Sequence, residues 1–217
     1  MVAPLLRVLA GSALMSARGQ RPAAASGDLA PADIAACRRG DRAALEAVFR
    51  AHAEPLARLL TRLVGPRAEV EDLLQDTFAA AITAFPSFRG EAAVKTWLHR
   101  IAIHVAHQHL RRPRHRREVE LPDPDAVVDE PPAALAPERR DLARRLYHHL
   151  DALGAARRIA LVLYAIEERS VDEIAVLMSA SKAATRSRIF WARRALMRRM
   201  RGDRELSGAL PPAGGRR

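Results

Sequence analysis

Basic residues are concentrated in the last predicted helix of the chain, between residues 182 and 201. This stretch carries eight lysines and arginines and no acid. Its apolar residues recur at helical spacing and would anchor the helix to its own domain: Ile189, Ala192, Leu196 and Met200. One buried stripe and one cationic face are what a helix needs in order to recognise the DNA major groove. The alternative interpretation is an ordinary solvated basic helix.

The residues before this helix favour the first interpretation. Ser170 is a predicted N-cap, and Glu173 three residues later completes a capping box. The short helix that begins there ends near Met178, and a three-residue turn of Ser, Ala and Ser leads to Lys182. A short helix, a tight turn and a longer basic helix predict a helix-turn-helix unit.

The composition points to a polyanionic partner and to an all-α fold. The 217 residues carry a net charge of +11, and 34 of the 36 basic residues are arginine. The planar arginine fork suits phosphates and base edges better than an ammonium group does. Hydrophobic residues reach 49%, mainly through Ala and Leu, whereas aromatic residues make up only 4%. Such a composition can fill helical cores but is poor for an aromatic-lined pocket.

No constellation of residues predicts catalysis or a cofactor. Cys37 is the single cysteine, which excludes an intramolecular disulfide and a zinc site of paired cysteines, and predicts a reducing cytoplasm. The chain also lacks an acidic metal cluster and a nucleophile beside a positioned base, so a nuclease or other enzyme is not expected. The five histidines between residues 99 and 115 could suggest a metal site, but His104 and His107 lack a nearby third ligand of matched geometry. We therefore expect them to face solvent or DNA rather than a metal.

The chain divides into two small helical domains joined by an acidic, proline-rich linker. We expect a domain over 31–113, a linker over 114–137 and a helix-turn-helix domain over 138–201. Residues 1–30 and 202–217 read as a disordered extension and a disordered tail. The linker has a net charge of −3 and the segment 138–217 one of +9, so the positive excess is C-terminal. The linker composition cannot bury a core.

Three helices are expected in the first domain, over about 44–63, 68–84 and 92–112, with a loop at 85–91. The second helix has Val70, Leu73, Leu74, Thr77, Phe78, Ala81 and Ile82 on its inward side. Asp72, Gln75 and Asp76 share its outer face by i, i+3 and i+4 spacing, a surface suited to a basic partner helix. The alternative is an ordinary solvated face.

No stretch approaches the roughly 20 apolar residues that span a bilayer. The first 14 residues faintly resemble a signal peptide, but Arg7 interrupts the apolar run. We expect a soluble, cytoplasmic protein without membrane insertion.

Several motifs in order make the chain resemble a known family. They are Glu71-Asp72-Leu73-Leu74-Gln75-Asp76-Thr77-Phe78, Phe85-Pro86-Ser87-Phe88-Arg89-Gly90-Glu91, Thr96-Trp97-Leu98, Leu150-Asp151-Ala152-Leu153, Glu173-Ile174-Ala175 and Ala192-Arg193-Arg194-Ala195-Leu196. Over about residues 33–200 the chain resembles the sigma-70 type initiation factors of bacterial RNA polymerase, in their compact extracytoplasmic-function form. The resemblance implies a region 2-like helical bundle followed by a region 4-like helix-turn-helix domain.

The resemblance also implies roles for particular residues. The face of Asp72, Gln75 and Asp76 would bind core RNA polymerase. The loop at 85–91 and the helix after it would trap unstacked bases, melt the promoter and read the minus-ten element, through Phe88, Arg89, Lys95, Trp97, Arg100, His104, Gln108, Arg111 and Arg112. Extruding a base costs a few kcal/mol of free energy, and favourable contacts with these residues must offset that cost. Trp97 has a second interpretation as a core residue.

In the helix-turn-helix the resemblance assigns minus-thirty-five contacts to Lys182, Ala184, Thr185, Arg186, Arg188 and Arg193. Arginine can pair with guanine, and threonine can touch a thymine methyl or a phosphate. The sequence departs from the family pattern at His104 and Gln108, where Asn and an acid are usual, and at Ser179, which replaces the turn glycine. A serine in a left-handed turn costs about 1 kcal/mol.

We interpret the chain as a sigma factor without catalytic residues or cofactors. Its expected partners are core RNA polymerase, promoter DNA and, where one exists, an anti-sigma factor. The rival hypothesis is an autonomous helix-turn-helix regulator of duplex DNA. Such a regulator would not need the acidic face at residues 69–76 or the loop at 85–91.

Overall fold

The computed structural model describes residues 30–67, 69–112 and 137–203. Within these ranges the secondary structure is helical and contains no strand, which confirms the all-α prediction. The expected linker, apart from Pro137, and most of the two expected disordered ends lie outside the described residues. The described residues fall into two compact units that divide between Gln108 and His109, within the last turn of the helix α5 (Val94–Arg111).

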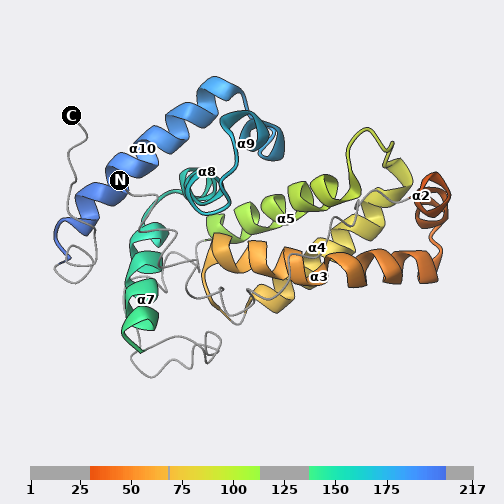
Figure 1. The fold of residues 1–217 in the computed structure, drawn as a ribbon, viewed down its shortest axis with the longest axis horizontal. Coiled ribbons are helices and arrows are strands. Elements are labelled where there is room, and N and C mark those ends of the chain that lie inside the picture. Colours follow the sequence, from red (N-terminus) through yellow and green to blue (C-terminus); the bar gives the residue numbers. More distant parts are fainter. Residues whose placement is uncertain (1–29, 68, 113–136, 204–217) are drawn as a thin grey trace. The chain divides into compact units, whose positions relative to one another are not determined.

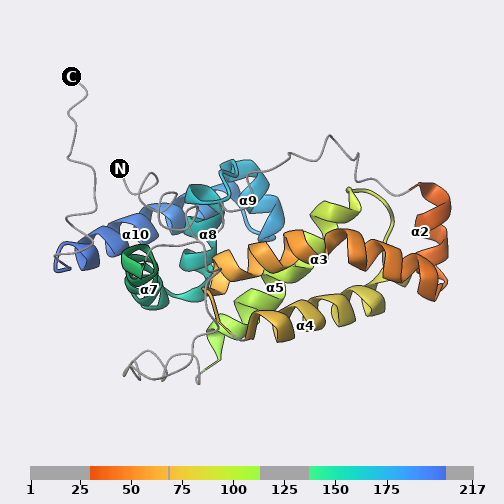
Figure 2. The ribbon, with the colours of Figure 1, turned by 60° about the horizontal axis from the view of Figure 1, so that its bottom comes forward.

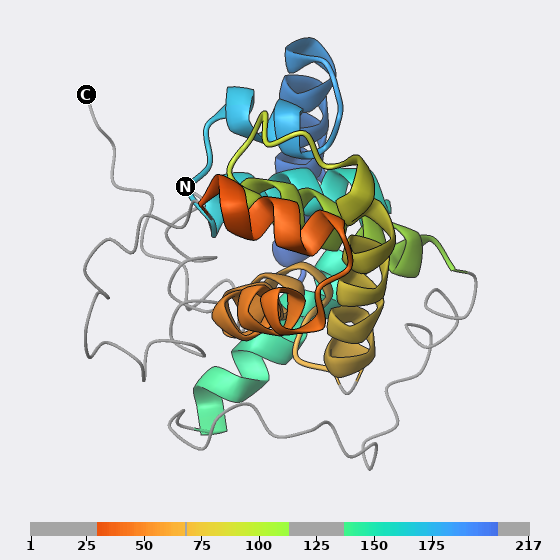
Figure 3. The ribbon, with the colours of Figure 1, turned by 90° about the vertical axis from the view of Figure 1, so that its right-hand side faces the viewer.

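The first unit contains four α-helices and a short 3-10 helix within the residues that the structure describes. They are α2 (Pro31–Arg38), α3 (Arg42–Val64), α4 (Glu69–Ala84), the 3-10 helix η2 (Phe85–Ser87) and α5 (Val94–Arg111). The helices α3, α4 and α5 lie alongside one another (Figures 1 and 2), and α2 packs across the end of α3 and against η2 (Figure 3). The sequence patterns predicted α3, α4 and α5, but α2 was not expected as a separate helix.

Local chemistry sets the ends of α3. The side chain of Asp41 accepts a hydrogen bond from the Ala44 backbone N–H at 2.9 Å and so caps the N-terminus. The helix ends at Gly65, whose φ of +94° lies in a region that side-chain-bearing residues avoid. Between these ends α3 buries one apolar side against its neighbours, and Phe49 stacks on Phe78 of α4 with ring centres 4.5 Å apart.

The predicted inward side of α4 is only partly correct. Leu73, Thr77 and Ala81 are buried, but Ile82 is 48% exposed. Ile82 follows Ala81 by one residue, so it lies about 100° around the helix from the buried Ala81, on a side that stays about half exposed. The inward stripe is therefore narrower than the sequence suggested.

The second unit is built around α8. Its helices are α7 (Pro137–Asp151), α8 (Ala155–Ala165), α9 (Val171–Leu177) and α10 (Lys182–Met200), and α10 packs on each of the other three. Residues 159–163 of α8 are all at most 1% exposed, so this helix is apolar around most of its circumference. Leu146 and Leu150 from α7 and Leu196 from α10 complete the core. This core holds the face of α10 that carries its arginines in a fixed orientation.

Candidate nucleic-acid interface

Two serine caps define the turn between α9 and α10. The Ser170 hydroxyl accepts from the Glu173 backbone N–H at 3.2 Å, and the Glu173 carboxylate accepts from the Ser170 N–H at 2.8 Å. This pair is the predicted capping box. Ser181 then caps α10 by accepting from the Ala184 N–H at 3.1 Å. The helix-turn-helix geometry thus follows from local hydrogen bonds that the sequence already specified.

Ser179 lies in this turn with φ of +48°. The family pattern has glycine at this position, so a left-handed backbone was expected here. Since the serine side chain must be accommodated there, the turn is strained relative to a glycine turn.

The helix α10 has one buried side and one broad exposed side. Its predicted anchors are all buried, at 6% exposure or less: Ile189, Ala192, Leu196 and Met200. Arg186, Arg193, Arg194 and Arg198 are exposed. The division between apolar anchors and cationic face is therefore confirmed.

Thr185 belongs to the buried side, which corrects its assignment to the DNA-contacting set. Its side chain is 0% exposed, and its hydroxyl donates to the Ser181 carbonyl at 3.0 Å. A hydroxyl that is buried and already hydrogen-bonded cannot reach a thymine methyl or a phosphate. We therefore remove Thr185 from the candidate interface.

The other five proposed contacts differ in exposure. Arg186 and Arg193 are exposed, whereas Arg188 and Ala184 are half-buried. Lys182 is exposed and pairs with Asp172 at the start of α9, with Nζ 2.9 Å from the carboxylate oxygen. Lys182 must leave or share this ion pair in order to bind a phosphate.

Two exposed aromatic residues on α10 were not predicted from the sequence. Phe190 is 56% exposed and Trp191 is 48% exposed, and their rings meet edge to face with centres 5.2 Å apart. The signal was present in the sequence, because Phe190 lies one turn after Arg186 within the basic run. Large apolar side chains left in solvent among arginines mark a contact surface.

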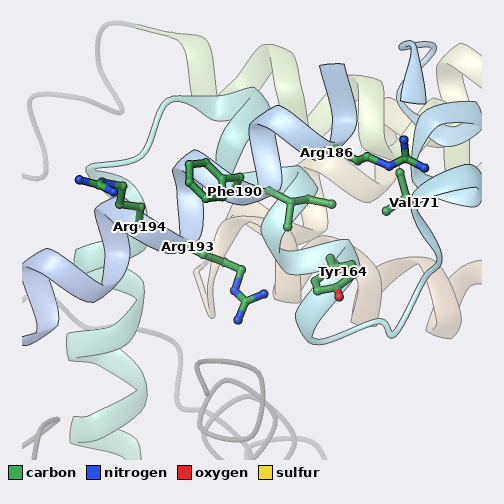
Figure 4. A pocket seen from close by; sticks show the side chains of 7 residues that line it. Tyr164, Val171, Arg186, Phe190, Arg193 and Arg194 are labelled. Atoms are coloured by element: carbon green, nitrogen blue, oxygen red, sulfur yellow. The ribbon is translucent and has the colours of Figure 1, made fainter. Parts of the chain in front are cut away.

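Phe190 lines an open groove of about 470 Å³ (Figure 4). Tyr164 of α8 and Val171 of α9 contribute apolar walls, and the groove is completed by Arg186, Ile189, Arg193 and Arg194. Arginines around an apolar floor suit a ligand that offers both negative charge and apolar surface, as the phosphates, sugars and thymine methyl groups of DNA do.

In the first unit, aromatic packing fixes the loop at residues 85–91. The ring centre of Trp97 on α5 lies 4.7 Å from that of Phe85 and 4.8 Å from that of Phe88. Phe85 is 0% exposed and Phe88 is 6% exposed. Phe88 is therefore a core residue in this structure, which corrects its assignment as a base-contacting side chain, and half-buried Trp97 packs as part of the same core.

The basic side chains around this loop are exposed. Arg89 is exposed, with a guanidinium nitrogen 3.8 Å from the Glu91 carboxylate. Gly90 beside it has φ of +76°, so this loop position disfavours other residues. Lys95 is also exposed. Burial, and then the positive charge of Lys95, lowers the pKa of His52 on α3.

One exposed stripe runs along α5. It consists of Arg100, His104, Gln108 and Arg111, spaced by one turn each, with Arg112 following. Within the stripe, Nε2 of Gln108 lies 2.7 Å from Nε2 of His104. All the predicted minus-ten residues of this helix beyond Trp97 are thus accessible on one face.

The predicted protein-binding face of α4 is also exposed. Asp72, Gln75 and Asp76 are all exposed, as is Glu71 beside them. This face is acidic in its first turn, where the helix dipole favours negative charge. A basic partner can contact the carboxylates of this face without any rearrangement of the core.

Neither a metal cluster nor a membrane-spanning helix occurs in the ranges that the structure describes. No group of three or more His, Cys, Asp or Glu side chains is placed to hold a metal ion there. No helix within those ranges is long and apolar enough to cross a bilayer. Cys37 is 1% exposed, and burial, with the carboxylates of Asp33 and Asp41, raises the pKa of its thiol.

Two family models match the chain in order. The model for sigma-70 region 2 matches residues 48–117, and the model for sigma-70 region 4 matches residues 143–196. The first match covers most of α3, α4 and α5, and the second spans the helix-turn-helix.

Curated proteins resemble the chain over most of their length. The RNA polymerase sigma-H factor of Pseudomonas aeruginosa is 35% identical over 167 residues, which cover 73% of this chain and 86% of that protein. The ECF RNA polymerase sigma-E factor of Haemophilus influenzae is 30% identical over 175 residues, covering 71% of this chain and 86% of the relative.

Two solved structures share the fold. The structure of CnrH in complex with the cytosolic domain of CnrY aligns with a TM-score of 0.54 and 25% identity, over 79% of this chain and 97% of that one. The sigma factor RpoE of Bartonella quintana, in complex with the anti-sigma factor NepR, aligns with a TM-score of 0.50 and 25% identity, over 73% and 98%.

Proposed function

Because this chain belongs to the sigma-70 family of RNA polymerase sigma factors, in its extracytoplasmic-function branch, we propose how its exposed faces divide promoter recognition among themselves. The chain is a sigma factor that directs RNA polymerase to promoters. The observation that carries this conclusion is the presence of region 2 and region 4 in one chain and in this order. An autonomous helix-turn-helix regulator is not favoured, since it would need no region 2.

The acidic face of α4 is the proposed contact with core polymerase. Asp72, Gln75 and Asp76 are exposed on one side of the helix, and their charge complements a basic helix of a large partner. The family is one of non-enzymatic initiation factors, so the chemistry of RNA synthesis belongs to the polymerase. We propose that the chain acts in the cytoplasm, where that polymerase works.

Two cationic surfaces are the proposed DNA contacts. The stripe on α5, with Arg89 and Lys95 near its start, would bind the minus-ten region. The face of α10 around Arg186 and Arg193 would bind the minus-thirty-five element in the major groove. The exposure of these side chains and the absence of acids from 182–201 support the assignment. We add Phe190 and Trp191 as apolar contacts to DNA.

A protein inhibitor is a further proposed partner. The similar sigma factor RpoE is bound by the anti-sigma factor NepR, and the exposed faces described above are the surfaces that such a protein would cover.

The decisive experiment is capture of core RNA polymerase by the full-length chain. Asp76→Arg places a positive charge on the acidic face, and we expect a loss of affinity on the order of 10- to 100-fold, because like charges then meet. The matched control is Asp33→Arg on α2, an exposed aspartate outside this face, which should bind as the wild type does. Equal capture of both variants, or no capture of the wild type, would contradict the proposal.

A further inference from the structure

Two side chains other than arginine occupy the middle of the cationic stripe on α5. His104 and Gln108 are one helical turn apart and both exposed, between Arg100 and Arg111. Arginines at the two ends can hold phosphates, and contacts of that kind set the position of a nucleic acid without reading its sequence. The pair between them has amide and imidazole groups, which suit the hydrogen-bonding edge of a base.

The hydrogen bond within the pair fixes which groups remain available. Nε2 of Gln108 lies 2.7 Å from Nε2 of His104. An amide nitrogen only donates, so Nε2 of the imidazole is the acceptor in this contact. Gln108 retains its carbonyl oxygen as an acceptor and its second amide N–H as a donor. His104 thus orients the amide without consuming its capacity for two parallel hydrogen bonds.

We propose that Gln108 reads an adenine of the minus-ten element and that His104 is the residue that positions it. The adenine N6 amino group donates and N7 accepts, which matches the free oxygen and N–H of the amide. This adenine edge has the same pattern in a duplex and in an unpaired strand. The inference rests on the proposed function of α5, and it adds the base and the positioning residue.

Transcription by the holoenzyme from a pool of templates randomised over the minus-ten region tests the proposal. Wild-type transcripts should show an adenine preference at one position, on either strand. Gln108→Ala should reduce that preference roughly 5- to 150-fold, the range for one good bidentate contact. His104→Ala should reduce it partly. His104→Gln, which restores an acceptor near Nε2, should recover it, whereas a merely structural histidine would not be rescued in this way.

A single-atom substitution in the DNA gives the sharpest readout. A template with 7-deaza-adenine at the selected position lacks the N7 acceptor, so it should lower wild-type activity and leave Gln108→Ala unaffected. His148→Ala, an exposed histidine on α7, is the control and should retain the wild-type preference. Equal effects of 7-deaza-adenine on wild type and Gln108→Ala, or a preference unchanged in Gln108→Ala, would overturn the inference. Failure of the wild type to transcribe any template would instead count against the proposed function.

Discussion

At the scale of single residues, one buried ion pair stands out in the second unit. Arg158 of α8 is 1% exposed, and its guanidinium donates to the carboxylate of Asp151, whose side chain is 5% exposed. The guanidinium also lies 5.7 Å from the centre of the Tyr147 ring. The pair connects the end of α7 to α8. Asp151 belongs to one of the family motifs of the sequence, but the motif alone does not predict its ion pair with Arg158.

Asp151→Ala should destabilise the chain by roughly 3–5 kcal/mol, because it leaves the Arg158 charge buried without its carboxylate. Urea denaturation of the full chain measures the change. Asp172→Ala removes the carboxylate of an ion pair whose two side chains are each 61% exposed, and it should cost at most about 1 kcal/mol. If both substitutions lowered the free energy of unfolding by similar amounts, burial would not explain the contribution of the Asp151–Arg158 pair.

At the scale of elements, the turn between α9 and α10 combines a good cap with a strained residue. The capping box of Ser170 and Glu173 begins α9, Ser181 begins α10, and Ser179 between them has φ of +48°. The caps satisfy backbone donors that would otherwise be unpaired at each helix start. A substitution that relieves the strain at Ser179 should therefore stabilise the second unit, whereas loss of a capping side chain should destabilise it.

Ser179→Gly should stabilise the second unit by roughly 0.5–1 kcal/mol, since glycine adopts a positive φ without strain. The control is Ser187→Gly within α10, which should destabilise it by about 0.5 kcal/mol through helix propensity. Thermal denaturation of the two variants should give midpoints on opposite sides of the wild type. A lower midpoint for Ser179→Gly would show that contacts of the serine side chain stabilise the unit by more than the backbone strain at this position destabilises it.

The capping box should also make stability depend on acid. Hydrogen bonds from the Ser170 backbone N–H and hydroxyl, and then from Arg169, lower the pKa of Glu173. A lowered carboxyl pKa contributes stability above the unfolded value, about 4.3, and loses it as the pH falls through the folded value. Glu173→Gln should therefore be less stable than wild type at pH 7, and the difference should shrink as the pH falls below about 4.3. A difference that stays constant between pH 7 and pH 3 would contradict this role.

At the scale of the whole molecule, each of the two units has its own buried core. The two tryptophans of the chain are divided between them, with Trp97 in the first unit and Trp191 in the second. Fluorescence of single-tryptophan variants of the full chain can therefore follow each unit separately.

We expect the two units to unfold at different urea concentrations. With Trp191→Phe, the signal of Trp97 reports the first unit, and adding Asp151→Ala should leave its midpoint unchanged. With Trp97→Phe, the signal of Trp191 reports the second unit, and the same Asp151→Ala change should lower its midpoint. A shift of both midpoints by equal amounts would mean that the chain unfolds as one cooperative body.

Local sequence determined much of this protein. The capping box at Ser170, the helix limit at Gly65 and the apolar stripe from Ile189 to Met200 were all predictable, because caps, turns and helical spacing act over a few residues. The exposed acids of α4 and the exposed arginines of α10 follow from the same periodicity. The ordered motifs also carried the family resemblance that the comparisons support.

Only the tertiary structure decided which side chains within those helices reach the surface. Thr185 and Phe88 became core residues, while Phe190 and Trp191 were left exposed. A helix of known sequence has a fixed order of side chains around its axis, but its rotation against its neighbours depends on packing from distant parts of the chain. That rotation separates the residues that can contact DNA from those that hold the contacting face in place.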